Sequence, residues 1–364
     1  MKINYTMYES KLTGGTRVIF EIANKLVERG HKVTITTLGS PLDIQWFNPK
    51  FKIIYVSCGS FLEKILRNLS RRVSKADFYP AIFIERLAKI IPDCDINVAT
   101  FCFTAFSVFR SDKGIPFYHM QHYEPLFFDN PYFCKLAKES YYLPLNKIAN
   151  SIWLKNTLEE KGIEDVIDIV NPAIDHNIFY SHLEKLHNTK KKVVALGKII
   201  KWKGLLNLFK AMKIVIKQRK DVELVLFGCK SLPPEYKKYQ VPYKCVGTLV
   251  DKELAKLYSE ADVVICSSWY ESFPLPPLEA MACGAPVITT RDGTEDYALN
   301  EENALVVSPR NSQALAEAIL RVLENEKLVS TLRENGFKTA KQFTWDKTTD
   351  KVEKLFLERL NKKI

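Results

Sequence analysis

The sequence lacks the features of a secreted or membrane-spanning protein. Residues 1–15 contain no apolar core of the kind that a signal peptide has. The longest apolar run, from Val98 to Phe109, is interrupted by threonine and serine and falls short of the roughly 20 residues that a spanning helix needs. We therefore expect a cytoplasmic chain that is not integral to a membrane.

Cysteine pairs and the dinucleotide glycine motif are missing as well. The eight cysteines occupy positions 58, 94, 102, 134, 229, 245, 266 and 283. None forms C-x-x-C and most lie in apolar runs, which predicts buried, reduced thiols. Gly14 and Gly15 do not belong to a G-x-G-x-x-G motif, so NAD is disfavoured. Asp93 and Asp95 form an Asp-x-Asp pair that precedes the predicted strand 96–100 instead of ending one, so we expect no metal and no cofactor.

Acidic residues are absent from one basic stretch. The chain carries a net charge of +11, and residues 185–220 hold twelve lysines or arginines without any aspartate or glutamate. Nucleic acid, an anionic membrane surface or a pyrophosphate ligand would each suit such a stretch. It also has the pattern of a strand and a helix, so a solvated face is the alternative. No nucleic-acid motif accompanies it, and we expect no nucleic-acid partner.

Strands and helices alternate along the chain, whose 364 residues suffice for about two domains. Near the N-terminus, a helix over 16–29 follows a first strand and leads to a strand over 31–36. In the second half, a strand at 192–196 is followed by further alternation, including a helix at 251–260 and a strand at 262–266. This alternation predicts an α/β protein with parallel sheets, whose ligands bind at the carboxyl ends of the strands.

Residues 268–288, SWYESFPLPPLEAMACGAPVI, organise the second half of the chain. Two prolines predict the start of a helix that runs from Leu278 to about Cys283. Glu271 then lies in the preceding loop, and Glu279 lies in the first helical turn. A helix N-terminus suits a phosphate, and carboxylates accept hydrogen bonds from the hydroxyls of a polyol. The stretch therefore indicates a nucleotide-sugar site; the alternative is an ordinary strand–loop–helix in which Glu279 complements the helix dipole.

Glu271 and Glu279, with seven residues between them, resemble the Glu-x7-Glu motif of the retaining glycosyltransferases of family 4, or glycosyl transferases group 1. The likeness includes YSEADVVICSS before the first glutamate and EAMACGAPVI from the second onward. It implies the GT-B fold, an α/β architecture of two Rossmann-like domains that face an interdomain cleft. Residues 1–175 would form the acceptor-side domain and 176–344 the donor-side domain. Residues 345–364 would form a C-terminal helix that crosses back to the first domain.

The resemblance also implies roles for single residues. It gives Glu279 the ribose hydroxyls, Glu271 the sugar hydroxyls, and Lys203 and Lys198 the diphosphate. Lys198 replaces the family's arginine, which keeps the charge but loses the bidentate fork. For both lysines the alternative is an exposed side chain in a lysine-rich chain. The implied donor-binding set also includes Gly14, Gly15, Ser272, Phe273, Leu275, Leu278 and Glu295.

His122 joins Glu271 and Lys203 as the third catalytic candidate. Aligned by a proline in GIPFYHMQHYEP, residues 114–125, it falls where the family has its cleft histidine. His119 is the competitor and is expected inside the strand, while a plain loop histidine is the alternative for His122. The sequence departs from the family's His-Asp pairing at Tyr123-Glu124, so the partner of His122 stays open.

By resemblance, the chain is an enzyme, a retaining hexosyltransferase that moves a sugar from a nucleoside diphosphate sugar to a glycan or lipid-linked acceptor. Surface polysaccharide or glycoconjugate assembly is the implied context. The alternatives are another GT-B enzyme acting on nucleotide-sugars, such as an epimerase, and a binding protein that has lost turnover. The basic, apolar segment 61–75 predicts a peripheral contact with anionic membrane at the inner face, or else a surface helix packed on the core.

Overall fold

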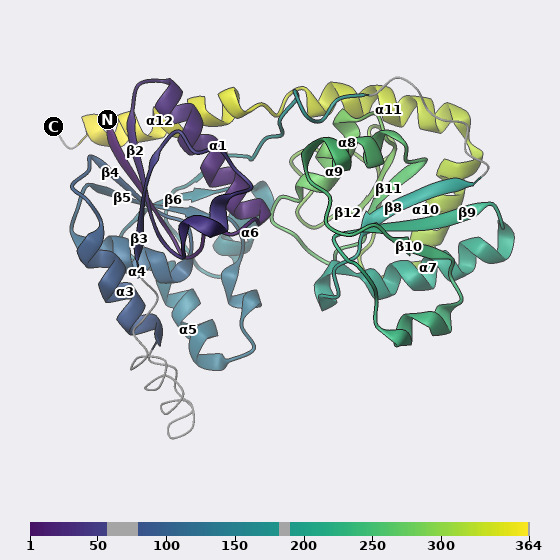
Figure 1. The fold of residues 1–364 in the computed structure, drawn as a ribbon, viewed down its shortest axis with the longest axis horizontal. Helices are drawn as coiled ribbons and strands as arrows, with labels where there is room; N and C mark the ends of the chain where they lie inside the picture. Colours follow the sequence, from purple (N-terminus) through teal and green to yellow (C-terminus); the bar gives the residue numbers. More distant parts are fainter. Residues whose placement is uncertain (57–78, 182–189, 363–364) are drawn as a thin grey trace. The chain divides into compact units, whose positions relative to one another are not determined.

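The computed structural model describes residues 1–56, 79–181 and 190–362, which form two compact units (Figure 1). Unit 1 comprises Met1–Pro172 together with Trp345–Ile364, and unit 2 comprises Ala173–Thr344. Unit 2 is therefore inserted into the chain of unit 1. The segment 61–75, with its predicted membrane contact, lies outside the described residues.

Unit 1 is built on a parallel sheet with the strand order β3-β2-β1-β4-β5-β6-β7 among the described residues. Its strands are mostly buried on both faces, as expected for a parallel sheet covered by helices. The strands are β1 (Lys2–Met7), β2 (Lys32–Leu38), β3 (Lys52–Val56), β4 (Ile96–Ala99), β5 (Ile115–Met120), β6 (Asn146–Ala149) and β7 (Ile167–Ile169).

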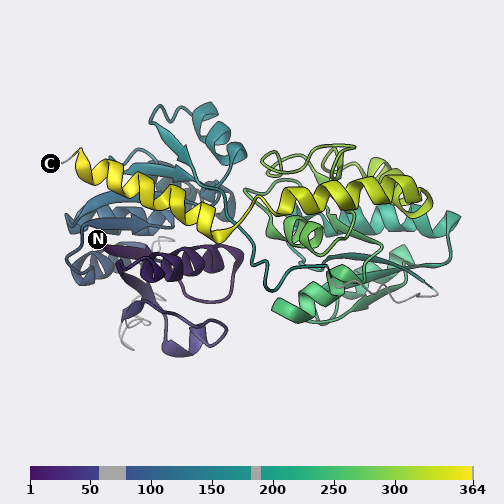
Figure 2. The same cartoon turned by 90° about the horizontal axis from the view of Figure 1, so that it is seen from above.

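Two helices from opposite ends of the chain lie side by side in unit 1, as both ribbon views show (Figures 1 and 2). They are α1 (Gly14–Glu28) and α12 (Trp345–Asn361). Phe356 of α12 is fully buried against Phe117, with ring centroids 4.8 Å apart. Arg29 also forms ion pairs with Asp350 and Glu353. The remaining described α-helices of unit 1 are α3 (Tyr79–Ile90), α4 (Cys102–Ser111), α5 (Pro131–Ser140) and α6 (Ile152–Glu160).

Unit 2 repeats this plan with the parallel strand order β10-β9-β8-β11-β12-β13 among its described residues. Figure 1 shows α7 and α10 on one face of this sheet and α8, α9 and α11 on the other. The strands are β8 (Lys191–Leu196), β9 (Val222–Phe227), β10 (Tyr243–Cys245), β11 (Val263–Cys266), β12 (Val287–Thr290) and β13 (Leu305–Val307). The helices are α7 (Leu205–Gln218), α8 (Asp251–Ser259), α9 (Leu275–Ala282), α10 (Ser312–Glu324) and α11 (Glu326–Ala340).

The strand order reverses once in each sheet, between β1 and β4 in unit 1 and between β8 and β11 in unit 2. Loops that leave the carboxyl ends of the strands diverge at such a reversal, which is where open α/β sheets bind ligands. None of the helices in the described residues combines the length and apolarity that crossing a bilayer requires.

Candidate functional site

Two loops of unit 2 meet at its strand-order reversal. The loop after β8 carries Lys203, and the loop after β11 carries Ser268 and Glu271. Lys203 Nζ lies 2.6 Å from Glu271 Oε1, and the Ser268 hydroxyl donates to the same oxygen at 2.6 Å. The two side chains of the ion pair are 23% and 12% exposed, so the pair is shielded but still open to solvent. A cation and a carboxylate therefore lie together at the strand-order reversal, where open α/β sheets bind ligands.

Two glycines allow this meeting of loops. Gly204 follows Lys203 with φ of 67°, and a Cβ there would lie 1.8 Å from the Ser267 carbonyl oxygen. Gly293 has φ of 97°, and its Cβ would lie 2.2 Å from the Glu271 carbonyl oxygen. Both backbones adopt a left-handed conformation and touch another backbone, which excludes any side chain. Our reading of the sequence attached no role to Gly293, because such a contact is not encoded by local spacing.

Helix α9 begins at Leu275, three residues earlier than the sequence pattern predicted. Pro276 and Pro277 occupy its second and third positions, and Pro274 is the N-cap. Glu279 therefore lies in the second turn, so the predicted first-turn position was wrong. Three of the four residues whose N–H groups are unpaired at a helix start are prolines, and Leu275 is left as the N–H donor of that turn.

Glu279 is 7% exposed and accepts a hydrogen bond from the Tyr258 hydroxyl at 3.3 Å. Tyr258 comes from α8 and is fully buried, so it fixes one oxygen of the carboxylate. Our sequence reading gave Tyr258 no role, and only the packing of α8 beside α9 brings the two residues together. Ser272, Phe273 and Leu278 are buried around the start of α9.

The other two donor candidates of unit 2 differ in surroundings. Lys198 is exposed directly after β8 and makes no ion pair within the part of the chain that the structure describes. Glu295 accepts a hydrogen bond from the Gly293 N–H at 2.7 Å. Burial raises the pKa of Glu295. Glu295 thus supports the loop that packs on the backbone of Glu271.

In unit 1, Gly14 and Gly15 form the first positions of α1, two residues before the predicted start at Thr16. The Thr13 side chain caps the helix by accepting from the Thr16 N–H at 3.1 Å. A Cβ at Gly15 would lie 3.0 Å from the side-chain oxygen of Gln121, whose amide donates to the Gly15 carbonyl at 3.1 Å. Gly14 has open space around it and leaves the helix N-terminus accessible.

His122 is 9% exposed in the loop after β5, with its ring 4.7 Å from that of Phe127 and 5.6 Å from that of Trp153. His119 lies inside β5, as predicted, and both of its ring nitrogens are buried without a hydrogen-bond partner. Burial lowers the pKa of His119 to about 4, so it is neutral near pH 7. The two histidines therefore differ in location. His122 lies in a loop at the carboxyl edge of the sheet, and His119 lies in the core.

Glu124 is directed into the core of unit 1. Its carboxylate accepts from the Cys102 N–H at the start of α4 and from the Tyr118 hydroxyl at 3.0 Å. Burial raises the pKa of Glu124 to about 8. These hydrogen bonds join the carboxylate to α4 and β5, so Glu124 stabilises the fold at the position where the resemblance would place an aspartate after the histidine.

Residues 181–339 match the model of the family described as glycosyl transferases group 1. This part of the chain is similar to the glycosyl transferases of group 1, and we refer to it below as the group 1 domain. An uncharacterized glycosyltransferase of Methanocaldococcus jannaschii is 29% identical over 217 residues, which are 58% of this chain and 59% of that protein. CapM of Staphylococcus aureus, a capsular polysaccharide biosynthesis glycosyltransferase, is 28% identical over 49% of this chain and 48% of its own length. The chain spans 59%, 57% and 26% of the length of the first three curated relatives that match it.

Solved structures match this chain over nearly its whole length. Sucrose-phosphate synthase from Thermosynechococcus elongatus has a TM-score of 0.79 at 18% identity, covering 99% of this chain and 100% of that chain. HepE of Anabaena, solved with UDP-glucose, has a TM-score of 0.78 at 16% identity, covering 98% and 100%. These likenesses confirm the predicted fold class, GT-B, with two Rossmann-like α/β domains.

The Asp-x-Asp pair lies before β4 and serves unit 1 structurally. Asp95 accepts from the Lys2 N–H at 2.6 Å, and Asp93 forms an ion pair with Lys113 at 3.1 Å. In the described residues, no group of three or more His, Cys, Asp and Glu side chains is placed to hold a metal ion.

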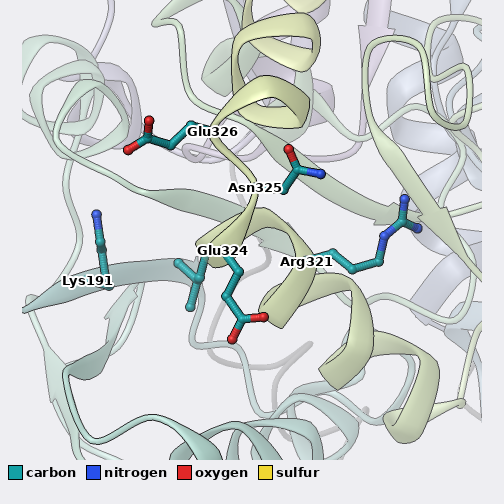
Figure 3. A pocket seen from close by; sticks show the side chains of 6 residues that line it. Lys191, Arg321, Glu324, Asn325 and Glu326 are labelled. Atoms are coloured by element: carbon teal, nitrogen blue, oxygen red, sulfur yellow. The ribbon is translucent and has the colours of Figure 1, made fainter.

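A hollow of about 710 Å³ opens on the group 1 domain at the other edge of its sheet (Figure 3). Lys191 is the first residue of β8, so the hollow lies at the amino ends of the strands, away from Lys203 and Glu271. Figure 3 shows charged side chains of both signs around it, among them Arg321 and Glu324. We therefore assign it no part in the site at the carboxyl edge.

Proposed function

We propose that the protein is a glycosyltransferase that moves a sugar from a nucleoside diphosphate sugar to a glycan or lipid-linked acceptor, with retention of the anomeric configuration. The observation that carries the proposal is the cluster of Lys203, Ser268 and Glu271 at the strand-order reversal of the group 1 domain. Beside it, Glu279 is held by Tyr258 in α9, whose start carries the free N–H of Leu275. The names of the relatives support a sugar transfer in polysaccharide assembly.

The chemistry asked of this cluster is stabilisation of a leaving group. The bond between the anomeric carbon and the diphosphate oxygen breaks, and its electron pair stays on the diphosphate. The acceptor hydroxyl oxygen bonds to that carbon and gives up its proton to the departing diphosphate oxygen. A fixed cation such as Lys203 stabilises the growing charge on the leaving oxygen, which is the largest single contribution in many enzymes. Glu271 orients the sugar through its hydroxyls.

Lys203 can serve both the protein and the donor. Its ammonium has three N–H donors, one of which is directed at Glu271. The other two are available for diphosphate oxygens, while Lys198 adds an exposed second cation. In unit 1, we propose that Gly14 and Gly15 border the donor phosphates and that His122 orients the sugar or the acceptor.

Donor binding provides the direct test of this function. We expect UDP-glucose or a related nucleotide-sugar to raise the melting temperature of the full chain. A donor at 100 times its Kd adds about 2.7 kcal/mol to the unfolding free energy. Lys203→Ala should lose most of that gain, whereas Lys256→Ala in α8 should keep it. If no nucleotide or nucleotide-sugar stabilises the protein, the proposed function is wrong.

Turnover separates a transferase from the other classes. Incubation with the bound donor and an acceptor should release a nucleoside diphosphate and lengthen the acceptor. An epimerase would change the sugar without releasing the diphosphate, and a binding protein would do neither.

We also propose that donor binding and transfer need no divalent metal. Lys198 and Lys203 supply positive charge for the diphosphate, and the start of α9 adds a helix dipole. Activity measured with excess chelator is therefore expected to persist. Loss of activity with recovery on adding magnesium or manganese would show that a metal supplies the charge instead.

A further inference from the structure

Two cysteines lie in contact at the carboxyl edge of the sheet of the group 1 domain. Cys229 follows β9, and Cys245 is the last residue of the neighbouring strand β10. Their sulfur atoms are 3.1 Å apart, and the Cys229 thiol donates to the Cys245 sulfur. Both residues are partly exposed, and both also pack against the hydrophobic core of unit 2.

The backbone around the pair is held from both sides. Gly247 N–H donates to the Cys229 carbonyl at 2.9 Å, and Gly228 N–H donates to the Gly247 carbonyl at 2.7 Å. A disulfide has sulfur atoms about 2.05 Å apart, so closing the pair requires the sulfurs to approach by about 1 Å. We expect rotation of the two side chains to supply this movement while these backbone hydrogen bonds remain.

Cys229 also touches the loop that carries the proposed diphosphate lysine. A Cβ placed on Gly197 would lie 2.3 Å from the Cys229 sulfur, so the sulfur packs directly on the Gly197 backbone. Gly197 N–H donates to the Phe227 carbonyl at 2.8 Å, and the next residue is Lys198. A change at the sulfur therefore acts on the first residues of the loop after β8.

We propose that Cys229 and Cys245 form a thiol–disulfide redox site and that its closure restrains the loop after β8. The oxidant is a small disulfide such as oxidised glutathione. The Cys245 thiolate attacks one glutathione sulfur and releases the first glutathione as a thiolate. Cys229 then loses its proton to water and attacks the Cys245 sulfur, which releases the second glutathione. The protein loses two hydrogen atoms in all, and two molecules of reduced glutathione form.

The division of roles between the sulfurs follows from where Cys229 packs. Its sulfur lies against the Gly197 backbone, so we assign the attack on glutathione to Cys245. Burial raises the pKa of Cys229 to about 12, which suits a resolving thiol that reacts only because its target is already in contact. Within the described residues, no second pair of cysteine sulfurs makes such a contact.

Mass spectrometry of the full chain tests the chemistry without any assumption about donor or activity. The reduced protein is incubated with oxidised glutathione, alkylated and weighed, and its peptides are mapped. We expect a product that carries two alkyl groups fewer than the alkylated reduced chain, with a linked Cys229–Cys245 peptide that dithiothreitol separates. Cys134→Ser should behave like the wild type, and Cys245→Ser should give no linked peptide. A wild type that yields only glutathione adducts, or a different linked pair, overturns the proposal.

Hydrogen exchange tests the effect on the loop. In the closed form, the amides of residues 197–203 should exchange about threefold or more slowly than in the reduced form. Equal exchange in the two forms overturns the link between the redox site and the loop.

A second experiment, which rests on the proposed function, compares how far UDP-glucose raises the melting temperature of the reduced and closed forms. If UDP-glucose stabilises the reduced form more than the closed form, the link between the redox site and the loop is supported. Equal stabilisation of the two forms contradicts it. Absence of any gain in the reduced form contradicts the proposed function, while the mass and exchange results still decide the redox site.

Discussion

Lys203 and Glu271 are the residues on which the candidate site depends. Their ion pair joins loops that are 68 positions apart in the chain, and Ser268 binds the same carboxylate oxygen. Because Glu271 Oε1 already accepts from both side chains, we propose that Oε2 is the oxygen that accepts from a sugar hydroxyl. Glu279 accepts a hydrogen bond from the neutral hydroxyl of Tyr258. Because the proposed roles of the two carboxylates differ, we expect the loss of each charge to change the kinetics in a different way.

We predict that Glu279→Gln raises KM and leaves kcat nearly unchanged, because ribose contacts are the same before and during sugar transfer. Glu271→Gln should lower kcat as well, since it acts on the sugar where charge redistributes. Steady-state kinetics with the true donor and acceptor measure both effects. If Glu279→Gln abolishes kcat while Glu271→Gln only weakens binding, the roles are reversed. Normal kinetics in both variants would show that the two glutamates of residues 268–288 serve the fold and not the reaction.

His119 should make stability depend on pH. Its folded-state pKa is about 4, below the ordinary value of 6.5, so the unfolded chain binds the proton more tightly. The contribution of neutral His119 to the free energy of unfolding is fully present above pH 6.5 and is lost as the pH falls toward 4. At pH 5 we expect the wild type to have lost about 2 kcal/mol of unfolding free energy relative to His119→Leu. Urea unfolding of both proteins at pH 7 and pH 5 measures this; parallel losses would contradict it.

Site residues that follow a local sequence pattern could be predicted, and those that depend on contacts between distant segments could not. The Glu-x7-Glu spacing and Lys203 were readable because they follow a local pattern, and the structure places Lys203 against Glu271. Gly293 was not readable, because its role is to touch the Glu271 backbone from another loop. Tyr258 was missed for the same reason, since a hydroxyl on α8 meets α9 only through packing.

At the scale of elements, boundaries followed from local signals and strand order did not. The helix predicted over 251–260 is α8, Asp251–Ser259, and the strand predicted over 262–266 is β11, Val263–Cys266. Helix α9 was placed three residues late because its prolines were read as lying at the start, whereas Leu275 is the first helical residue. The pairing of β8 with β11, which creates the site, depends on long-range packing that local pattern does not contain.

Helix α12 stabilises unit 1 through one buried face. Phe356 is fully buried against Phe117, while the next residue, Leu357, is 40% exposed. Phe356→Ala should therefore cost about 3–5 kcal/mol, through lost burial and the cavity that remains. Leu357→Ala is the matched control and should cost about 1 kcal/mol or less, because its side chain is already in partial contact with water. Chemical denaturation of both variants tests this, and equal losses would show that α12 does not pack as described.

At the scale of the whole molecule, the net charge of +11 favours binding to anionic surfaces. We propose that it binds anionic membrane peripherally, a role that the sequence also predicts for residues 61–75. Cosedimentation with anionic liposomes should fall as salt rises, because exposed charges are screened over about 10 Å at 0.1 M. Neutral liposomes of the same size are the control. Equal binding to both kinds, or none to the anionic ones, would contradict the proposal.

The insertion of unit 2 into unit 1 has a consequence for synthesis on the ribosome. The strands of unit 1 emerge first, but α12, which covers Phe117, is translated only after all of unit 2. At about 5–20 residues per second, that interval lasts roughly ten to thirty seconds. At the end of this interval unit 2 has its whole sequence and can fold, while the nascent first domain has kept an apolar face uncovered throughout. A message cut short immediately before the codon for Trp345 would thus yield a complete second domain attached to an incomplete first one.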